Sequence, residues 1–323
     1  MSPNDSAFAV FRLLGVPGVG PTRIWTVLDF AKHIHASPAE LVDQPDGLTA
    51  VLSGEQIREL RHHEEQAWEV WEKLREQEVS VLTIFDGAYP NSLRLILDKS
   101  APPLLFVKGN KGLLGKASVG FCGSRKPSGK GLAVAGECAV MASKEGINVV
   151  SGYAAGIDMT THRAALEMGG TTTIVLAEGI FHFRIKRDLQ DLWDWSQAVV
   201  VSEYLPTIPW SIHNAMRRNQ TLCSLCTAMV LIEAQETGGS IAAGRTCLKL
   251  GIPLFAPVYE GMPESAKGNQ ILLTEGARFL YKSRTTQMPN LRGVLAVFRS
   301  PSIGSEQLRK LRPLEFKTAG MRR

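Results

Sequence analysis

The sequence predicts an α/β protein with a doubly wound parallel sheet and a small N-terminal helical domain. From residue 116 onward, short continuous apolar runs alternate with helical stretches, and glycine or other turn residues stand at the joints. Such runs indicate strands that are buried on both faces and joined by right-handed crossovers. Residues 7–80 instead space their apolar residues as helices do. The predicted sheet is therefore Rossmann-like and follows a helical segment.

The helical domain is predicted over residues 1–80, with helices at 7–14, 21–30 and 55–78. The third of these is long and charged, and its apolar residues fall at roughly helical spacing. The glycine-rich turn at 15–23 resembles a helix-hairpin-helix turn, in which backbone N–H groups at a helix N-terminus hold a phosphate. The alternative is a tight turn in a helical bundle, which the net charge of −6 over residues 1–80 favours.

The rest of the chain divides into three further segments. Residues 81–115 are predicted to form a connector leading into the sheet, with strands at 81–85 and 104–107. The Rossmann-like domain is predicted over 116–281 and a basic C-terminal tail over 282–323. The predicted strands of the sheet are 117–122, 147–150, 172–177, 198–201, 228–232 and 253–258. The predicted helices between them are 131–144, 159–168, 183–194, 215–226 and 240–250.

Composition and charge exclude several classes of protein. The 323 residues are 44% hydrophobic and 21% charged, which is typical of a globular protein, and no apolar run approaches the length of a membrane span. Five cysteines in a chain of this length imply no disulfide framework, so a cytoplasmic protein is expected. The net charge of +5 is uneven, with −6 over residues 1–80 and +8 over 281–323. Contact with a polyanion is therefore expected in the middle of the chain or in the tail.

Small and polar residues follow four of the predicted strands. They occupy 123–125, 151–158, 202–203 and 233–240. In a doubly wound sheet, ligands bind beyond the carboxyl ends of the strands, where loops present backbone N–H groups at helix N-termini. Every such loop needs turn residues, so one of them alone indicates little. Four on the same edge predict an anion-binding surface.

The sequence shows no catalytic constellation. The spacing of Gly123, Gly129 and Gly131 departs from the dinucleotide-binding fingerprint, and there is no P-loop. Cys223 and Cys226 form a single CxxC in an apolar stretch, which favours core packing over a metal site. Asp158 and Glu233 have side chains that can act as an acid or a base. Asp158 stands at a helix start, however, where an aspartate serves equally well as an N-cap. No metal, cofactor or enzymatic activity is expected.

Taken in order, the loops resemble the DNA-processing protein A family, also called Smf. The matching motifs are GSR at 123–125, SGxAxGID at 151–158, SE at 202–203, RN at 218–219, EA and SG within 233–240, GN at 268–269 and EGA at 275–277. The connector around Tyr89 and Pro90 matches the segment that this family places before its sheet. The resemblance covers roughly residues 8–280, and the ordered motifs make it specific.

The resemblance implies a non-catalytic protein that binds single-stranded DNA, forms a homodimer and hands the strand to a RecA-type recombinase during natural transformation. At matching positions, Arg125, Arg218 and Asn219 would contact phosphate, with Arg217 and Lys186 as nearby candidates. The remaining implied DNA-binding residues shape the loops: Gly123, Ser124, Ser151, Gly152, Gly156, Asp158, Thr237, Gly238, Gly239 and Ser240. The alternative for Arg125 and Arg218 is a salt bridge that fixes two loops, to Asp158 or Glu233.

Three departures from the family pattern leave other functions open. Gln220 stands where the family usually has a third arginine, residues 181–184 read Phe-His-Phe-Arg in place of a Tyr-Pro, and a basic tail replaces the winged helix of many members. These changes suggest a paralogue that regulates an operon-encoded partner protein, as an antitoxin-type protein in phage defence would. A third hypothesis is a phosphoribohydrolase-like enzyme, since residues 237–240 partly echo its nucleotide-binding loop and Glu233 would act in catalysis.

Overall fold

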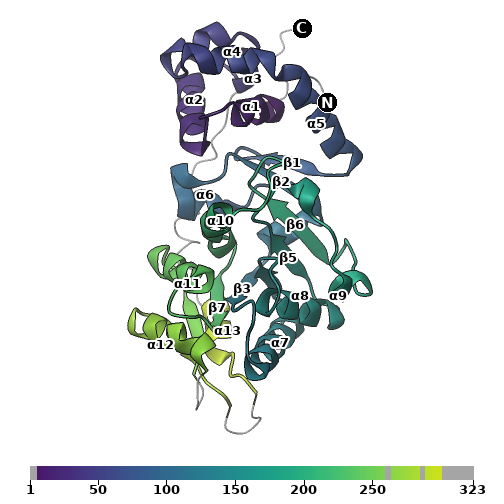
Figure 1. Ribbon diagram of the computed structural model, residues 1–323, viewed down its shortest axis with the longest axis vertical. Coiled ribbons are helices and arrows are strands. Elements are labelled where there is room, and N and C mark those ends of the chain that lie inside the picture. Colours follow the sequence, from purple (N-terminus) through teal and green to yellow (C-terminus); the bar gives the residue numbers. More distant parts are fainter. Residues whose placement is uncertain (1–5, 259–262, 284–287, 300–323) are drawn as a thin grey trace.

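The computed structural model describes residues 6–258, 263–283 and 288–299. Figure 1 shows a group of helices from the N-terminal part at one end and a twisted sheet with its own helices below them. The N-terminal helices are α1 (Ser6–Gly15), α2 (Pro21–His33), α3 (Pro38–Asp43), α4 (Gly54–His62) and α5 (Glu64–Glu76), with a 3-10 helix at Pro45–Ala50. Their apolar faces pack on α1, whose residues 7–11 and 13 are buried.

The predicted single helix over 55–78 is wrong, because the chain breaks between α4 and α5 at His63. The His63 ring is used for tertiary contacts, with Nδ1 2.6 Å from the carbonyl oxygen of Glu59 and Nε2 2.9 Å from that of Arg12. Arg12 is itself buried, and its guanidinium donates to the Leu60 carbonyl and the Glu64 carboxylate. These hydrogen bonds attach the last turn of α4 to α1, and α5 begins after them in a different direction.

The sheet contains nine strands among the described residues, in the order β1-β2-β6-β5-β4-β3-β7-β8-β9. Strands β3 to β9 pair in parallel, while β1 and β2 add to the edge of β6 as antiparallel strands. The prediction of a doubly wound, Rossmann-like sheet is confirmed. The strands are β1 (Ser80–Thr83), β2 (Leu104–Gly109), β3 (Ser118–Gly123), β4 (Asn148–Ser151), β5 (Thr172–Val175), β6 (Ala198–Ser202), β7 (Ala228–Ile232), β8 (Leu254–Pro257) and β9 (Arg278–Leu280).

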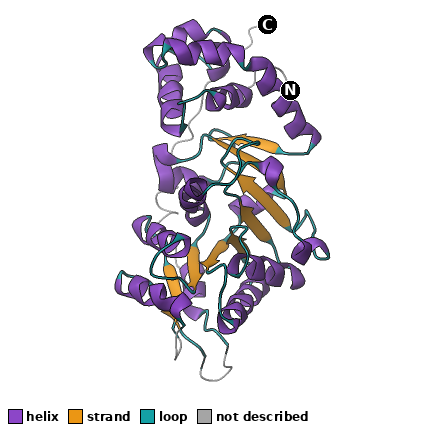
Figure 2. Ribbon diagram, in the orientation of Figure 1, coloured by secondary structure: helices purple, strands orange, loops and turns teal. Residues whose placement is uncertain are grey.

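Helices cover both faces of this sheet (Figure 2). On one face, α7 (Gly129–Lys144) and α8 (Ile157–Glu167) pack against each other over β3 and β4, and α13 (Arg292–Arg299) joins the same core. On the other face, α10 (Ile212–Ser224) and α11 (Gly239–Lys249) pack together. The remaining helices are α6 (Asn91–Leu97), α9 (Arg187–Gln190) and α12 (Lys267–Thr274), with 3-10 helices at Asp98–Ser100, Lys111–Gly115, Ile180–His182 and Glu264–Ala266.

The segment 183–194 was predicted to be one helix, but only the four residues of α9 are helical. Its aromatic side chains explain the difference. The rings of Phe183 and Trp193 lie 5.7 Å apart, and those of Trp193 and Trp195 lie 5.1 Å apart. Residues ten apart in one α-helix are separated by about 15 Å along its axis, so Phe183 and Trp193 could not meet in a single helix. Packing of these rings therefore replaces the predicted helix with a compact loop.

Two findings concern the remaining parts of the chain. The connector contributes β1 and β2 to the sheet itself, in addition to leading into it. Of the predicted basic tail at 282–323, residues 284–287 and 300–323 lie outside the described residues, whereas Arg292–Arg299 form α13 and pack on the core of the sheet domain. In the part of the chain that the structure describes, no helix has the length and apolar character that crossing a bilayer requires.

Candidate functional site

The predicted loops meet where the strand order reverses, between β3 and β7. β3 has β4 on one side and β7 on the other, so the loops that follow β3 and β7 leave the same edge toward opposite faces of the sheet. Ligands of doubly wound sheets bind at this switch point. Gly123 ends β3 there, and a Cβ added to it would lie 1.9 Å from the Ile232 carbonyl oxygen of β7. Only glycine permits this approach of the two strands.

Glu233 fastens the loop after β7 to the loop after β3. Its side chain is fully buried, and its φ of +55° is in the left-handed region. The backbone N–H of Ser128 donates to one carboxylate oxygen at 2.7 Å, and the Ser128 hydroxyl donates to the other. The same hydroxyl caps α7 by accepting from the Gly131 N–H at 3.0 Å. Glu233 therefore holds two loops and the start of α7 together.

The loop after β4 is locked against the loop after β3. Gly156, at φ +78°, brings its backbone so close to the carbonyl oxygens of Ser124 and Arg125 that an added Cβ would lie 2.5 and 2.8 Å from them. The Ser151 hydroxyl donates to a carbonyl of β3 at 2.7 Å. The buried Asp158 carboxylate accepts from the Ala154 N–H at 3.1 Å, inside its own loop. Gly156, Ser151 and Asp158 thus fix the shape of this loop, and their part in DNA binding remains a prediction.

Arg218 reaches this loop from α10 on the opposite face. Its Nη1 donates to the Val175 carbonyl oxygen at the end of β5, at 2.8 Å. A Cβ on Gly152 would lie 2.4 Å from that nitrogen and 2.6 Å from an oxygen of Asp158, so the glycine leaves room for both groups. Burial lowers the pKa of Arg218, and the charge of Asp158 opposes this. Its Nε has no hydrogen-bond partner in the described structure.

Arg125 and Lys186 are exposed cations on the rim of the same edge. The Arg125 guanidinium carbon lies 5.4 Å from the centre of the Trp210 ring. The Lys186 Nζ lies 4.2 Å from the centre of the Tyr153 ring and donates to the Tyr153 carbonyl oxygen. Partial burial lowers the pKa of Lys186, the negative charges of Asp158 and Glu178 oppose this, and the positive charge of Arg125 adds to the lowering. Two positive charges thus lie close enough to influence each other.

The ion pairs of the described residues include neither Arg125 nor Arg218. The alternative for these arginines, a salt bridge to Asp158 or Glu233, is therefore not among the ion pairs of the described residues. Arg217 does form an ion pair, with its Nε 3.4 Å from an oxygen of Glu203 after β6. Arg125, Lys186 and, more deeply placed, Arg218 are among the cations at this edge of the sheet that form no ion pair in the described structure.

The other predicted site residues, Ser124 apart, are either buried on α10 or lie at the start of α11 and in the loop before it. Asn219 is 7% exposed and lies on the buried side of α10. Residues 237–239 are exposed in the loop before α11, and the Ser240 hydroxyl donates to the Gly123 carbonyl oxygen at 2.7 Å. Their predicted contact with phosphate remains a prediction, as does that of Ser124. The loops that carry them converge at the switch point.

Sequence reasoning missed three contributors. Ser128 stands directly before the glycine-rich start of α7, and a serine in that position was a signal for an N-cap. Tyr153 lies within the SGxAxGID motif at 151–158, and the Lys186 ammonium group lies over its ring. Trp210 lies in the loop between β6 and α10 and is 47% exposed. Nothing in the spacing of residues indicated that Trp210 meets Arg125, because this contact joins loops 85 residues apart.

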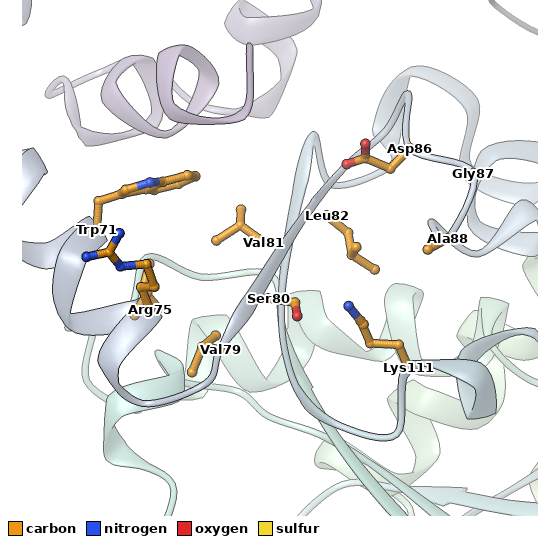
Figure 3. A pocket seen from close by; sticks show the side chains of 11 residues that line it. Trp71, Arg75, Val79, Ser80, Val81, Leu82, Asp86, Gly87, Ala88 and Lys111 are labelled. Atoms are coloured by element: carbon orange, nitrogen blue, oxygen red, sulfur yellow. The ribbon is translucent and has the colours of Figure 1, made fainter. Parts of the chain in front are cut away.

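A separate pocket lies at the other end of the sheet, between α5 and the edge strand β1 (Figure 3). Trp71, Arg75, Val81 and Lys111 are among the residues that line it. None of the predicted site residues is among them. In the described residues, no group of histidine, cysteine and acidic side chains has the arrangement of a metal site.

The protein has a Rossmann-like fold, and exposed arginine and lysine side chains lie at the switch point of its sheet. The DNA recombination-mediator protein A family matches residues 80–289, which is most of the described sheet. The protein belongs to this family.

Relatives and solved structures agree with this assignment. The DNA processing protein DprA of Streptococcus pneumoniae is 33% identical over 207 residues, which are 63% of this chain and 72% of the relative. The DprA of Bacillus subtilis is 30% identical over 213 residues, 65% of this chain and 70% of that one. The structure of the S. pneumoniae protein aligns with a TM-score of 0.70 at 26% identity, covering 85% of this chain and 94% of that one.

A second solved structure shares the fold. It is DNA processing protein A of Helicobacter pylori, which aligns with a TM-score of 0.53 at 23% identity over 62% of this chain and 90% of that one. That structure concerns the single-stranded DNA binding mode of the H. pylori protein.

Proposed function

We propose that this protein binds single-stranded DNA at the switch point of its sheet and acts as a recombination mediator. The observation that carries the proposal is the pair of exposed cations, Arg125 and Lys186, on a rim built from the family's loops. The protein would grip the strand by its phosphates and would not read its sequence.

The surroundings of the two cations suit a phosphate ligand. Each cation lies over an aromatic ring, which orients the side chain without neutralising its charge. A phosphate oxygen bound between them would gain charge-assisted hydrogen bonds, which are stronger than neutral ones. Arg218 lies below, with its Nε facing no acceptor, and it adds positive charge beneath the loop. A negatively charged ligand would relieve the mutual repulsion of Arg125 and Lys186.

The mediator role rests on the family and not on the geometry. We propose that the bound strand is handed to a RecA-type recombinase and that the protein works as a homodimer. The test is recombinase filament formation on DNA that is covered by a single-strand binding protein. Filament formation should accelerate when this protein is added. Equal rates with and without it would exclude loading but leave DNA binding standing.

Glu233 does not favour the enzymatic hypothesis. Both of its carboxylate oxygens accept hydrogen bonds from Ser128, and the side chain is fully buried. A general acid or base must reach a substrate atom within hydrogen-bond distance. The position of Glu233 instead supports a role in holding the loops.

The binding test is fluorescence anisotropy with a labelled single-stranded oligonucleotide at low salt. We expect Arg125→Ala and Lys186→Ala each to weaken binding by roughly 10- to 100-fold, since a charge-assisted hydrogen bond contributes about 1.5–3 kcal/mol. Lys144→Ala is the matched control. Lys144 is exposed at the carboxyl end of α7, and because α7 runs back along the sheet, this end lies at the opposite edge. Failure of the unaltered protein to bind would exclude the proposed function.

A further inference from the structure

Trp210 and its neighbours form an exposed apolar patch beside the rim. Trp210 is 47% exposed, and three further exposed apolar side chains accompany it in the loop before α10 and on α10 itself. They are Ile208 at 36%, Ile212 at 74% and Met216 at 42% exposure. An exposed cluster of large apolar side chains commonly marks an interaction site. We call Ile208, Trp210, Ile212 and Met216 the Trp210 patch.

The patch is continuous with the cationic rim. The Arg125 guanidinium lies over the Trp210 ring, with its carbon 5.4 Å from the ring centre. Arg217 is exposed on α10, within the same stretch of chain as Met216. A ligand for this surface must therefore carry an apolar face and a negative charge close together. A nucleotide of a single strand has both, because the base offers a flat ring and the backbone a phosphate.

We propose that Trp210 is a base-binding platform, on which one unpaired base stacks while Arg125 holds an adjacent phosphate. This inference rests on the proposed function and adds a second subsite to it. Stacking on an aromatic ring is tolerant of sequence, because every base has a π-face. It discriminates strongly between single and double strands, since a base inside a duplex is already stacked on its neighbours.

Charge argues for a base over other occupants of the patch. Arg125, which lies over Trp210, and Lys186, which is close enough to Arg125 for the charge of Arg125 to act on it, would lie near the border of any apolar contact there. A second copy of this chain that placed the same patch against it would bring these positive charges together. A strand of DNA brings negative charge to the same place. The patch and the rim thus fit one ligand.

The test compares two labelled strands of equal length, one of thymidine nucleotides and one of abasic residues with the same phosphates. We expect Trp210→Ala to weaken binding of the thymidine strand by roughly 5- to 150-fold, which corresponds to the loss of one stacked base. Binding of the abasic strand should weaken much less, because that strand loses only the support that the Trp210 ring gives to Arg125. Trp210→Phe should recover most of the loss. The matched control is Trp68→Ala, since Trp68 is 36% exposed on α5 and far from the switch point in the chain.

The outcomes separate this inference from the proposed function. Equal affinities of Trp210→Ala and the unaltered protein for the thymidine strand would overturn the platform, while DNA binding that depends on Arg125 would stand. Equal losses on both strands would also overturn it. No binding of either strand at low salt would overturn the proposed function and the platform with it. A change in the oligomeric state of Trp210→Ala, measured by sedimentation, would assign the patch to a second copy instead.

Discussion

At the scale of single residues, Gly123 determines how closely β3 and β7 approach at the switch point. A methyl group there would lie 1.9 Å from the backbone oxygen of Ile232, which cannot move without disturbing β7. We expect Gly123→Ala to lower the free energy of unfolding by about 1–3 kcal/mol or more. Urea denaturation measures the change. Gly129→Ala is the control, since a Cβ at Gly129 meets nothing within 4 Å, and it should leave the protein as stable as before.

The buried His162 makes stability depend on pH. Its ring is fully buried, with Nε2 2.6 Å from the Gly152 carbonyl oxygen and Nδ1 2.6 Å from the Thr172 hydroxyl oxygen. Burial lowers the pKa of His162. The unfolded chain binds a proton at this residue near its ordinary pKa of about 6.5, whereas the folded protein does so only at lower pH. Stability is therefore lost as the pH falls below that value.

His162→Gln isolates this contribution. The free energy of unfolding of the unaltered protein, relative to that of the variant, should decrease between pH 8 and pH 5.5. Thermal or urea unfolding at the two pH values measures it. A difference that stays constant over this range would show that His162 binds its proton equally in both states.

Residue-scale geometry also explains what the sequence could reveal of the site. The loops were predictable because their glycines and small residues stand directly after buried strands. The relation of Arg218 to Gly152 was not, because α10 brings the arginine from the other face of the sheet. The same holds for Trp210, whose contact with Arg125 depends on how two loops fold. Spacing along the chain carries no signal for such contacts.

At the scale of elements, the start of α7 depends on Ser128. Its hydroxyl caps the helix at the Gly131 N–H and also donates to Glu233. We expect Ser128→Ala to lower the free energy of unfolding by about 1–3 kcal/mol, because a cap is lost and a buried carboxylate loses a donor. Ser53→Ala is the comparison, since Ser53 caps α4 at an exposed site and should cost only about 1 kcal/mol. A smaller effect at Ser128 than at Ser53 would contradict the role of Glu233.

The elements divide into those that local sequence determines and those that packing determines. The parallel strands β3 to β8 were predicted to within a few residues, because burial on both faces makes each a continuous apolar run. β9 was not predicted, because two of its three residues are exposed. Two helices were predicted wrongly, at 55–78 and 183–194. In both, tertiary contacts prevent one continuous helix: the His63 ring bonds to α1 in the first, and Phe183 packs on Trp193 in the second.

At the scale of the whole molecule, the sheet is extended by the antiparallel pairing of β2 with β6, which local sequence patterns do not predict. Phe106 of β2 pairs with Ser202 of β6, almost a hundred residues later. The connector thereby becomes the antiparallel edge of the sheet, and the N-terminal helices stand beyond it (Figure 1). The division of the chain into domains at residues 80, 115 and 281 remains a prediction.

The distribution of charge over the molecule matches a strand bound at the sheet and not at the helical end. Residues 1–80 carry a net charge of −6, which would repel a phosphate backbone. The cations with no carboxylate partner at the switch point lie in the sheet domain. The net charge of residues 81–280, which make up most of this domain, is positive. This separation predicts that binding depends on salt through a small number of local contacts.

The most direct test of DNA binding at the switch point is the salt dependence of affinity. The logarithm of the affinity for a single-stranded oligonucleotide would be measured against the logarithm of salt concentration in the unaltered protein, Arg125→Ala, Lys186→Ala and Lys144→Ala. Each phosphate contact contributes about 0.7 to the slope for a single strand. We expect the slope to become shallower by about that amount in Arg125→Ala and in Lys186→Ala, and to stay unchanged in Lys144→Ala. Unchanged slopes in the first two variants would show that DNA binds elsewhere on the protein.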